Sequence, residues 1–162
     1  MQQDSDNNPF RQYAFARYQQ PGVADQLLHL QDHYGLNVNL LLFMAWLGQC
    51  RQRVDAAFIK TCVLQIQTLD KTIIQPLREV RRNIRQQLGD DEHYRQAKAL
   101  ELSLETLVLD KLYQQAVTTP PPAVGEFCMA DNVHDYCNRE RSGHIDQQLL
   151  QKLDFYCLNG LA

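Results

Sequence analysis

An uninterrupted apolar run in the first third of the chain limits its fold more than any other feature. Residues 40–47 read LLLFMAWL, with a glycine on either side, Gly35 and Gly48, and two asparagines just before the run. The run is far shorter than the roughly 20 residues that a bilayer-spanning helix needs. It also lacks the polar face of a helix that lies on a protein surface. We therefore expect residues 38–47 to form a central core helix that other helices enclose; a ligand pocket or partner groove is the alternative.

Periodic apolar residues predict that most of the remaining chain is helical as well. Glycine and proline are scarce, at seven and six in 162 residues, which disfavours many short strands. Gly35 stands where a left-handed residue ends a helix, and Asn37 is a suitable N-cap for the central helix. Pro76 is expected to kink a helix or to restart it, and Gly89 to end one. The predicted fold is an all-α single-domain bundle of about six to seven helices around the central apolar helix.

Composition divides the chain into four stretches. Residues 1–9 are polar and acidic and are expected to be a flexible N-terminus, followed by a helical core domain over residues 10–116. Residues 117–125 include a run of three prolines, which favours an extended linker. Residues 126–162 are expected to form a C-terminal helical extension that packs on the core.

The cysteines and the N-terminal sequence bear on location. The chain has five cysteines, an odd number, and most lie within helical patterns, which suits reduced thiols better than disulfides. The first ten residues have neither the basic nor the apolar segment of a signal peptide. We expect a cytoplasmic protein with no membrane association.

Positive charge is concentrated in the middle of an otherwise acidic chain. Residues 51–88 hold eight bases and three acids, although the whole chain has a net charge of −3. Four arginines share a helical arc about 100° wide, and an apolar flank adjoins it. We expect the apolar flank to anchor the helix to the core and the arginines to point outward. The arginines are Arg78, Arg81, Arg82 and Arg85, and the flank is Leu77, Val80, Ile84 and Leu88.

Guanidinium groups match carboxylates and phosphates in bidentate geometry, so this arginine cluster is the predicted partner-binding site. The resulting hypothesis is a non-enzymatic interaction or adaptor protein that docks an acidic protein surface or a phosphorylated ligand. Nucleic acid fits less well, because the chain is acidic and lacks an aromatic platform for bases. The competing interpretation is that the face is solvated or neutralised internally, by Glu92, Glu101, Glu105 or Asp110.

Two histidine-containing sets are weaker candidates for metal ligands. His29 and His33 lie four residues apart on one predicted helix face, but a third ligand must come from elsewhere. The second set, with spacing unlike that of ordinary zinc sites, is Cys128, His134, Cys137 and His144. We predict no metal and no cofactor, and we identify no catalytic residues. A metal- or small-ligand-binding helical protein, which could also be catalytic, is the alternative function.

Two long segments resemble a known family. They read ARYQQPGVADQLLHLQDHYGLNVNLLLFMAWLG and IIQPLREVRRNIR, and they contain the motifs PGV, LQD, VNLLLF and PLR followed by VRR. The chain resembles, over about residues 10–115, a family of short conserved hypothetical proteins of proteobacteria whose function is unknown. The resemblance implies a helical cytoplasmic bacterial protein, and it brings no catalytic residues with it. Beyond residue 120 the sequence departs from the family pattern.

Overall fold

The computed structural model describes residues 8–89, 91–140 and Gln148. Most of this part of the chain is helical. In chain order the helices are α1 (Pro9–Tyr18), α2 (Val23–Tyr34), α3 (Val38–Gln49), α4 (Ala56–Leu69), α5 (Gln75–Asn83), α6 (Asp91–Thr118) and α7 (Met129–Glu140). Two π-helical segments, η2 (Asp70–Ile74) and η3 (Ile84–Leu88), flank α5. The all-α single domain that the periodicity predicts is confirmed.

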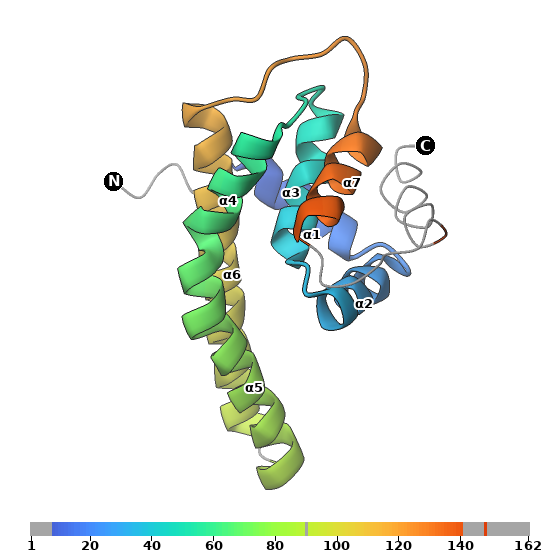
Figure 1. Cartoon of the computed structure of the whole chain (residues 1–162). Coiled ribbons are helices and arrows are strands. Elements are labelled where there is room, and N and C mark those ends of the chain that lie inside the picture. Colours follow the sequence, from blue (N-terminus) through green and yellow to red (C-terminus); the bar gives the residue numbers. More distant parts are fainter. Residues whose placement is uncertain (1–7, 90, 141–147, 149–162) are drawn as a thin grey trace.

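Helix α3 lies in the middle of the body of the molecule, as the apolar run predicts (Figure 1). All of its residues from Leu40 to Gly48 are buried except Trp46, which is half-buried. Phe10 of α1 packs on this helix, with its ring centroid 4.9 Å from that of Phe43 and 5.4 Å from that of Trp46. Tyr113 of α6 meets Trp46 edge-on at 5.9 Å. The interpretation as a core helix is therefore confirmed.

The predicted signals at the start of α3 are also confirmed. Gly35 ends α2 in the left-handed region, at φ 67°, which costs glycine little because it has no Cβ. The Asn37 side-chain oxygen accepts hydrogen bonds from the amides of Asn39 and Leu40, at 2.9 and 3.2 Å. These bonds satisfy two of the amide groups that a helix leaves unpaired at its N-terminus.

Helix α7 packs along α3 and completes its enclosure (Figure 1). The fully buried Asn132 accepts from the Val54 amide at 3.1 Å and donates to the Gln52 carbonyl at 2.8 Å. The Tyr136 hydroxyl accepts from the Asn37 amide at 3.0 Å. Before α7, the proline-containing segment is hydrogen-bonded to residues 51–53, through Pro122 and Val124.

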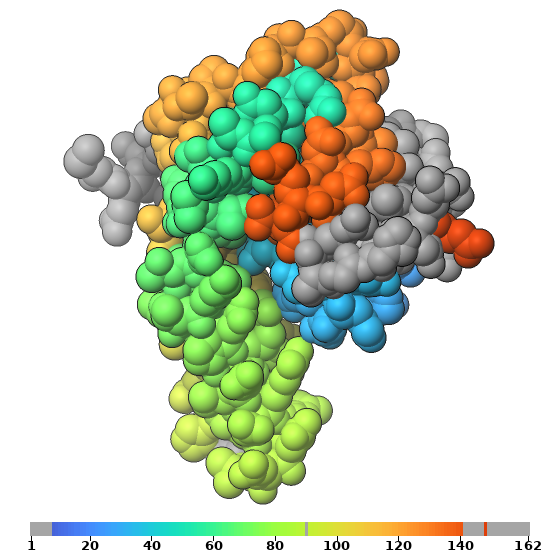
Figure 2. All heavy atoms as spheres, viewed as in Figure 1, coloured from blue at the N-terminus to red at the C-terminus, as the bar shows by residue number. Residues whose placement is uncertain are grey.

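Residues 56–88 form one continuous helical stretch in which α4, η2, α5 and η3 follow one another. The chain passes Pro76 without stopping: the wider π-helical turn of η2 immediately precedes the position where proline lacks an amide hydrogen. Gly89, at φ 58°, ends this stretch, and α6 then returns alongside it. We call η2, α5, η3 and α6 the hairpin. Its far end projects beyond the rest of the molecule (Figures 1 and 2).

The expectation that the apolar flank anchors α5 to the core is wrong. Helix α5 has no buried residue, and Val80 and Leu88 are 52% and 71% exposed. The reason is that α5 lies beyond the body and packs chiefly on α6 rather than on the central helices. None of the helices that the structure describes is both long and apolar enough to cross a bilayer.

Gly48 is the tightest point between α3 and α7 and gives a test of this packing. A Cβ added there would lie 2.4 Å from the Met129 Cα atom, so Gly48→Ala should separate the two helices and lower the melting temperature. The sign of the change in stability is informative. In an unobstructed helix alanine is more favourable than glycine by about 1 kcal/mol, so without this contact Gly48→Ala would stabilise the protein. Gly125→Ala, where nothing lies within 4 Å, is the control and should leave the melting temperature nearly unchanged. A stabilised Gly48→Ala variant would contradict this packing.

Candidate functional site

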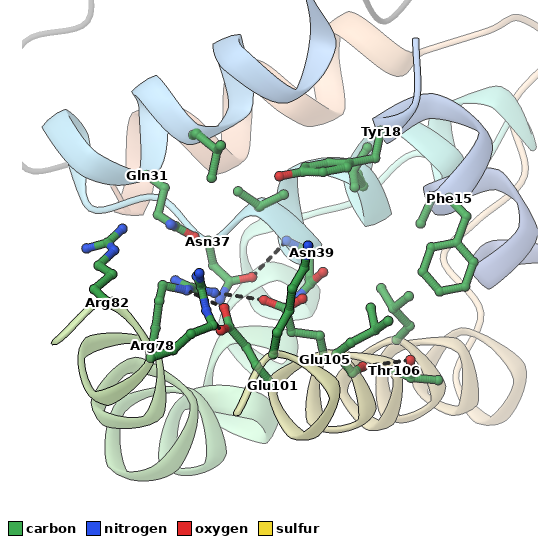
Figure 3. A pocket seen from close by; sticks show the side chains of 18 of the residues that line it. Phe15, Tyr18, Gln31, Asn37, Asn39, Arg78, Arg82, Glu101, Glu105 and Thr106 are labelled. Atoms are coloured by element: carbon green, nitrogen blue, oxygen red, sulfur yellow. Dashed lines mark hydrogen bonds and ion pairs between the residues drawn. The ribbon is translucent and has the colours of Figure 1, made fainter. Parts of the chain in front are cut away.

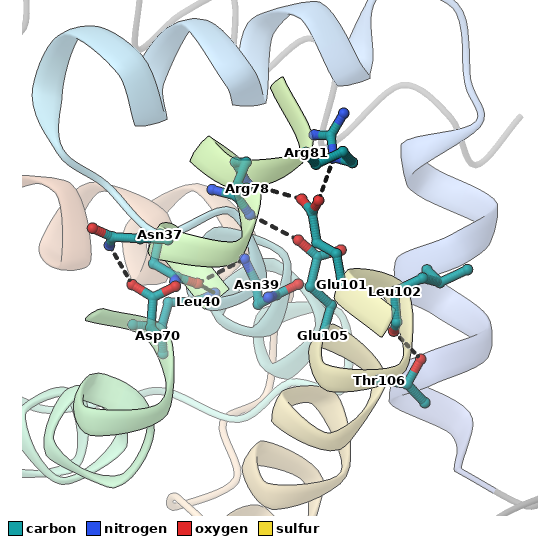
Figure 4. Close-up of polar contacts among 11 residues, drawn as sticks. Asn37, Asn39, Leu40, Asp70, Arg78, Arg81, Glu101, Leu102, Glu105 and Thr106 are labelled. Atoms are coloured by element: carbon teal, nitrogen blue, oxygen red, sulfur yellow. Dashed lines mark hydrogen bonds and ion pairs between the residues drawn. The ribbon is translucent and has the colours of Figure 1, made fainter. Parts of the chain in front are cut away.

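A buried carboxylate joins two of the predicted arginines to α6. The Glu101 side chain is 9% exposed and accepts from Arg78 Nε at 3.0 Å and from Arg81 Nε on its other oxygen. Arg78 also donates through Nη2 to Glu105 at 2.8 Å. Figure 4 shows these bonds running from α5 to two successive turns of α6. The four side chains therefore hold the two helices of the hairpin in register.

The expectation that all four arginines point outward is wrong for Arg78 and Arg81. Their side chains are only 17% and 19% exposed, because the arginine arc, rather than the apolar flank alone, faces α6. Arg85 is exposed and lies 3.7 Å from Asp91, with its guanidinium group over the Tyr94 ring. Arg82 is exposed and makes no ion pair with any residue that the structure describes.

The carboxylates considered for internal neutralisation have separate partners. Glu101 and Glu105 bind the arginine cluster, as one interpretation of the sequence holds. Glu92 instead pairs with Arg95 at 2.7 Å. Asp110 binds Arg11 of α1 at 2.6 Å, which ties α6 to the body. Glu101 and Glu105 thus pair with Arg78 and Arg81, Arg85 pairs with Asp91, and Arg82 is left available.

Three of the four arginines, Arg78, Arg81 and Arg82, line a cleft of about 460 Å³ between the hairpin and α1, α2 and α3 (Figure 3). This volume lies in the range of small-ligand sites. One wall is apolar and aromatic, from Phe15, Tyr18, Leu28 and Leu42. The other wall carries charge, from Arg78, Arg81, Arg82, Lys98, Glu101 and Glu105. We call this space the interhelical cleft.

Charge in the interhelical cleft is unevenly balanced. Its lining carries four cationic and two anionic side chains, so the net formal charge is positive. Lys98, like Arg82, has no ion-pair partner among the described residues. A neighbouring hollow of about 270 Å³ shares Arg78 and Arg82 with the cleft but is lined by three acids, Asp32, Asp70 and Glu79. An anion is therefore favoured on the α6 side of Arg82 and disfavoured on the opposite side.

The two carboxylates differ in their protonation. Burial alone would raise the pKa of Glu101, but hydrogen bonds from Arg81 and Arg78 outweigh it and hold that pKa below the ordinary value. At Glu105 burial prevails over the attraction of Arg78, and the pKa is raised. Burial also raises the pKa of Tyr18, which keeps its hydroxyl protonated at neutral pH. Glu101 is thus the firmly ionised partner, and Glu105 is the weaker one.

Among the residues that the structure describes, neither metal candidate set forms a metal site. Among residues 8–89 and 91–140 no three His, Cys, Asp or Glu side chains are placed to hold a metal ion. The His29 and His33 rings lie 4.2 Å apart, and His33 Nδ1 is 3.1 Å from the His29 carbonyl. Cys128 and Cys137 are buried, whereas His144 lies outside the described residues.

A comparison with protein families identifies the chain. The family described as "Protein of unknown function (DUF2390)" matches residues 10–112. The chain belongs to the DUF2390 family. Neither the curated proteins nor the solved structures contain a match to it. The matched part of this DUF2390 protein runs from α1 into α6 and includes all the residues that line the interhelical cleft, but it does not include α7.

Several cleft residues of the DUF2390 protein escaped the sequence analysis. Phe15 and Tyr18 lie on α1, and Lys98 lies on α6, and they meet the arginines only because the hairpin folds back beside α1–α3. Phe15 is 42% exposed although it is a large aromatic residue. On a helical wheel it falls outside the core face that Phe10 and Ala14 define.

Reversing the charge of two adjacent arginines should separate their roles. Arg81→Glu in the DUF2390 protein would set a carboxylate against buried Glu101, and we expect it to destabilise the fold by about 3–5 kcal/mol. Arg82→Glu, one residue away on the same helix, should change the free energy of unfolding by no more than about 0.5 kcal/mol. Denaturant unfolding of both variants measures the difference. Equal effects of the two substitutions would contradict the pairing described here.

Glu101 and Glu105 should affect the pH dependence of stability in opposite directions. The lowered pKa of Glu101 gives stability that is present above the ordinary value of about 4.5 and is lost as pH falls through the folded value. The raised pKa of Glu105 favours folding while that group is protonated, and this gain is lost as pH rises through its folded value. Unfolding should be measured from acid to neutral pH. Relative to wild type, Glu101→Gln should lose stability at neutral pH, whereas Glu105→Gln should not.

Proposed function

We propose that this DUF2390 protein is a non-enzymatic interaction protein of the cytoplasm, and that an acidic segment of a partner protein docks in its interhelical cleft. The observation that carries the proposal is the pair of exposed cations, Arg82 and Lys98, placed opposite an aromatic wall in a cleft of about 460 Å³. Neither cation has an ion-pair partner among the described residues. The free cysteines Cys50, Cys62 and Cys128 are consistent with a reducing compartment.

The chemistry of the two walls defines the docking segment. Arg82 and Lys98 attract a carboxylate, and Phe15, Leu28 and Tyr18 offer apolar surface to a neighbouring side chain. A segment with an acidic residue beside an aromatic or aliphatic one satisfies both walls. The cleft volume suits a few side chains rather than a broad protein surface. The protonated Tyr18 hydroxyl adds a hydrogen-bond donor for the same carboxylate.

Glu105 sets the strength of this docking. Its carboxylate is bound to Arg78 at 2.8 Å, whereas burial raises its pKa and so disfavours its ionised form. An incoming carboxylate would compete with Glu105 for the Arg78 guanidinium group. Glu105 thus acts as an internal competitor that limits affinity.

The proposal predicts which peptides the full-length protein selects from a random display library. Enriched peptides should carry an acidic residue beside an apolar one, and their binding should weaken as salt increases because exposed charges are screened. Arg82→Glu and Lys98→Glu should each weaken binding at least about tenfold, since like charges at an interface cost several kcal/mol. Lys60→Glu, the same charge change on an exposed residue of α4 outside the cleft, is the control and should bind as wild type does.

Further measurements sharpen this experiment. Glu105→Gln should tighten peptide binding by removing the internal competitor, whereas Glu92→Gln, on the same helix but outside the cleft, should not. Enrichment without any acidic preference would contradict the proposal, as would equal binding by Arg82→Glu and wild type. Binding of phenyl phosphate, with no peptide enriched, would instead support a small phosphorylated ligand.

A further inference from the structure

The side of the hairpin that faces away from the interhelical cleft carries exposed apolar residues. Val80, Leu100 and Leu107 are 52%, 52% and 43% exposed. Two further apolar side chains extend the set at the two ends of α5, Ile73 at 47% and Leu88 at 71%. We call these five residues the outer face.

The spacing of cleft residues explains why the outer face lies on the opposite side. Two residues along an α-helix rotate a side chain by about 200°. Val80 is two residues from both Arg78 and Arg82, which line the cleft. Leu100 is likewise two residues from Lys98 and from Leu102, which line the cleft. Leu107 is two residues from Glu105 and from Leu109, which also line it. Because α5 and α6 both line the cleft and pack on each other, their outward residues share the far side of the hairpin.

Few charged side chains lie on the outer face. The arginines of α5 either line the cleft or, in the case of Arg85, pair with Asp91, and Glu79 lines the neighbouring hollow. The residues next to Val80 and Leu100 on the outward arcs are uncharged and polar: Asn83, Gln87, Gln96 and Ser103. On α6, His93 and Lys111 lie at the two ends of this arc. The same two helices thus carry a charged side that lines the cleft and an opposite side with few charges.

The size of the outer face is sufficient for specific association. Sixteen helical residues, from Ile73 to Leu88, extend about 24 Å, and two adjacent helices are about 20 Å wide, which gives on the order of 500 Å². Two such faces bury about 1,000 Å², near the lower limit for a specific protein interface.

We propose that the outer face binds the outer face of a second copy of this chain. In a two-fold symmetric interface each residue meets the same surface, so a self-complementary patch must avoid like charges across the axis. The middle of the outer face, around Val80 and Leu100, meets this condition, because the residues next to them on the outward arcs are uncharged. Two stacked hairpins form a four-helix bundle, which encloses Val80 and Leu100 on both copies. The two interhelical clefts remain open on opposite sides of the dimer.

The mass of the full-length protein in solution, measured by light scattering over a range from about 1 to about 200 µM, tests the proposal by mass action. Wild type should approach twice the chain mass at the upper end. Val80→Glu should raise the dissociation constant at least about a hundredfold, since it places carboxylates against an apolar surface and, in a symmetric dimer, does so twice. Val117→Glu is the matched control, because Val117 is 55% exposed but lies at the C-terminal end of α6, outside the outer face. This variant should dimerise as wild type does.

Circular dichroism and the melting temperature of each variant show that the monomer is folded. Leu100→Glu, on the other helix of the hairpin, provides a second independent variant if Val80→Glu fails to fold. A wild type that stays monomeric at every concentration would overturn the proposal and leave the outer face to another partner. A dimer that resists both substitutions would overturn it as well, by placing the interface elsewhere.

Discussion

The enclosure of α3 is the constraint on which the rest of the structure depends. A helix that is apolar on every side gains the full free energy of burial only when neighbours cover all of it. Helices α1, α2, α6 and α7 provide that cover, but α3 has twelve residues and is only about 18 Å long. The 28 residues of α6 extend about 42 Å. The hairpin must therefore run past the core, and its far end has no central helix to pack on.

Beyond the core, polar contacts fix the geometry of the hairpin. Glu101 lies between Arg78 and Arg81 at a position where an apolar residue would otherwise fill the interface. Such a buried ion pair contributes little net stability, because the desolvation cost offsets most of the attraction, but breaking it is costly. Its effect here is to fix the register of α5 against α6. The opposite pKa directions of Glu101 and Glu105, one turn apart, show how narrowly burial and attraction are balanced.

The sequence predicted the body of the fold better than the site, for a physical reason. Caps such as Asn37 and Gly35 and the apolar run of α3 act within a few residues, so their effects are local and can be recognised in the sequence. The helical wheel also placed the arginines correctly on one arc. It could not show which arc faces α6, because Arg78 and Glu101 lie 23 residues apart and meet only through the turn at Gly89. The sequence also indicated which carboxylates could pair with the arginines. Which partner each carboxylate takes, however, depends on tertiary packing.

The hairpin inverts the usual arrangement of a surface helix pair, in which charges face water and apolar residues face the partner helix. In α5 two arginines point inward, and Val80 of α5 and Leu88 of η3 remain exposed. Burying the arginines gives no clear gain in stability over an apolar interface, and exposing the valine and leucine forgoes burial that was available. Folding of a single chain does not account for this pattern. The recognition proposed for the two sides of the hairpin would account for it, because an acidic segment requires cations in the cleft and a symmetric neighbour requires a surface with few charges opposite them.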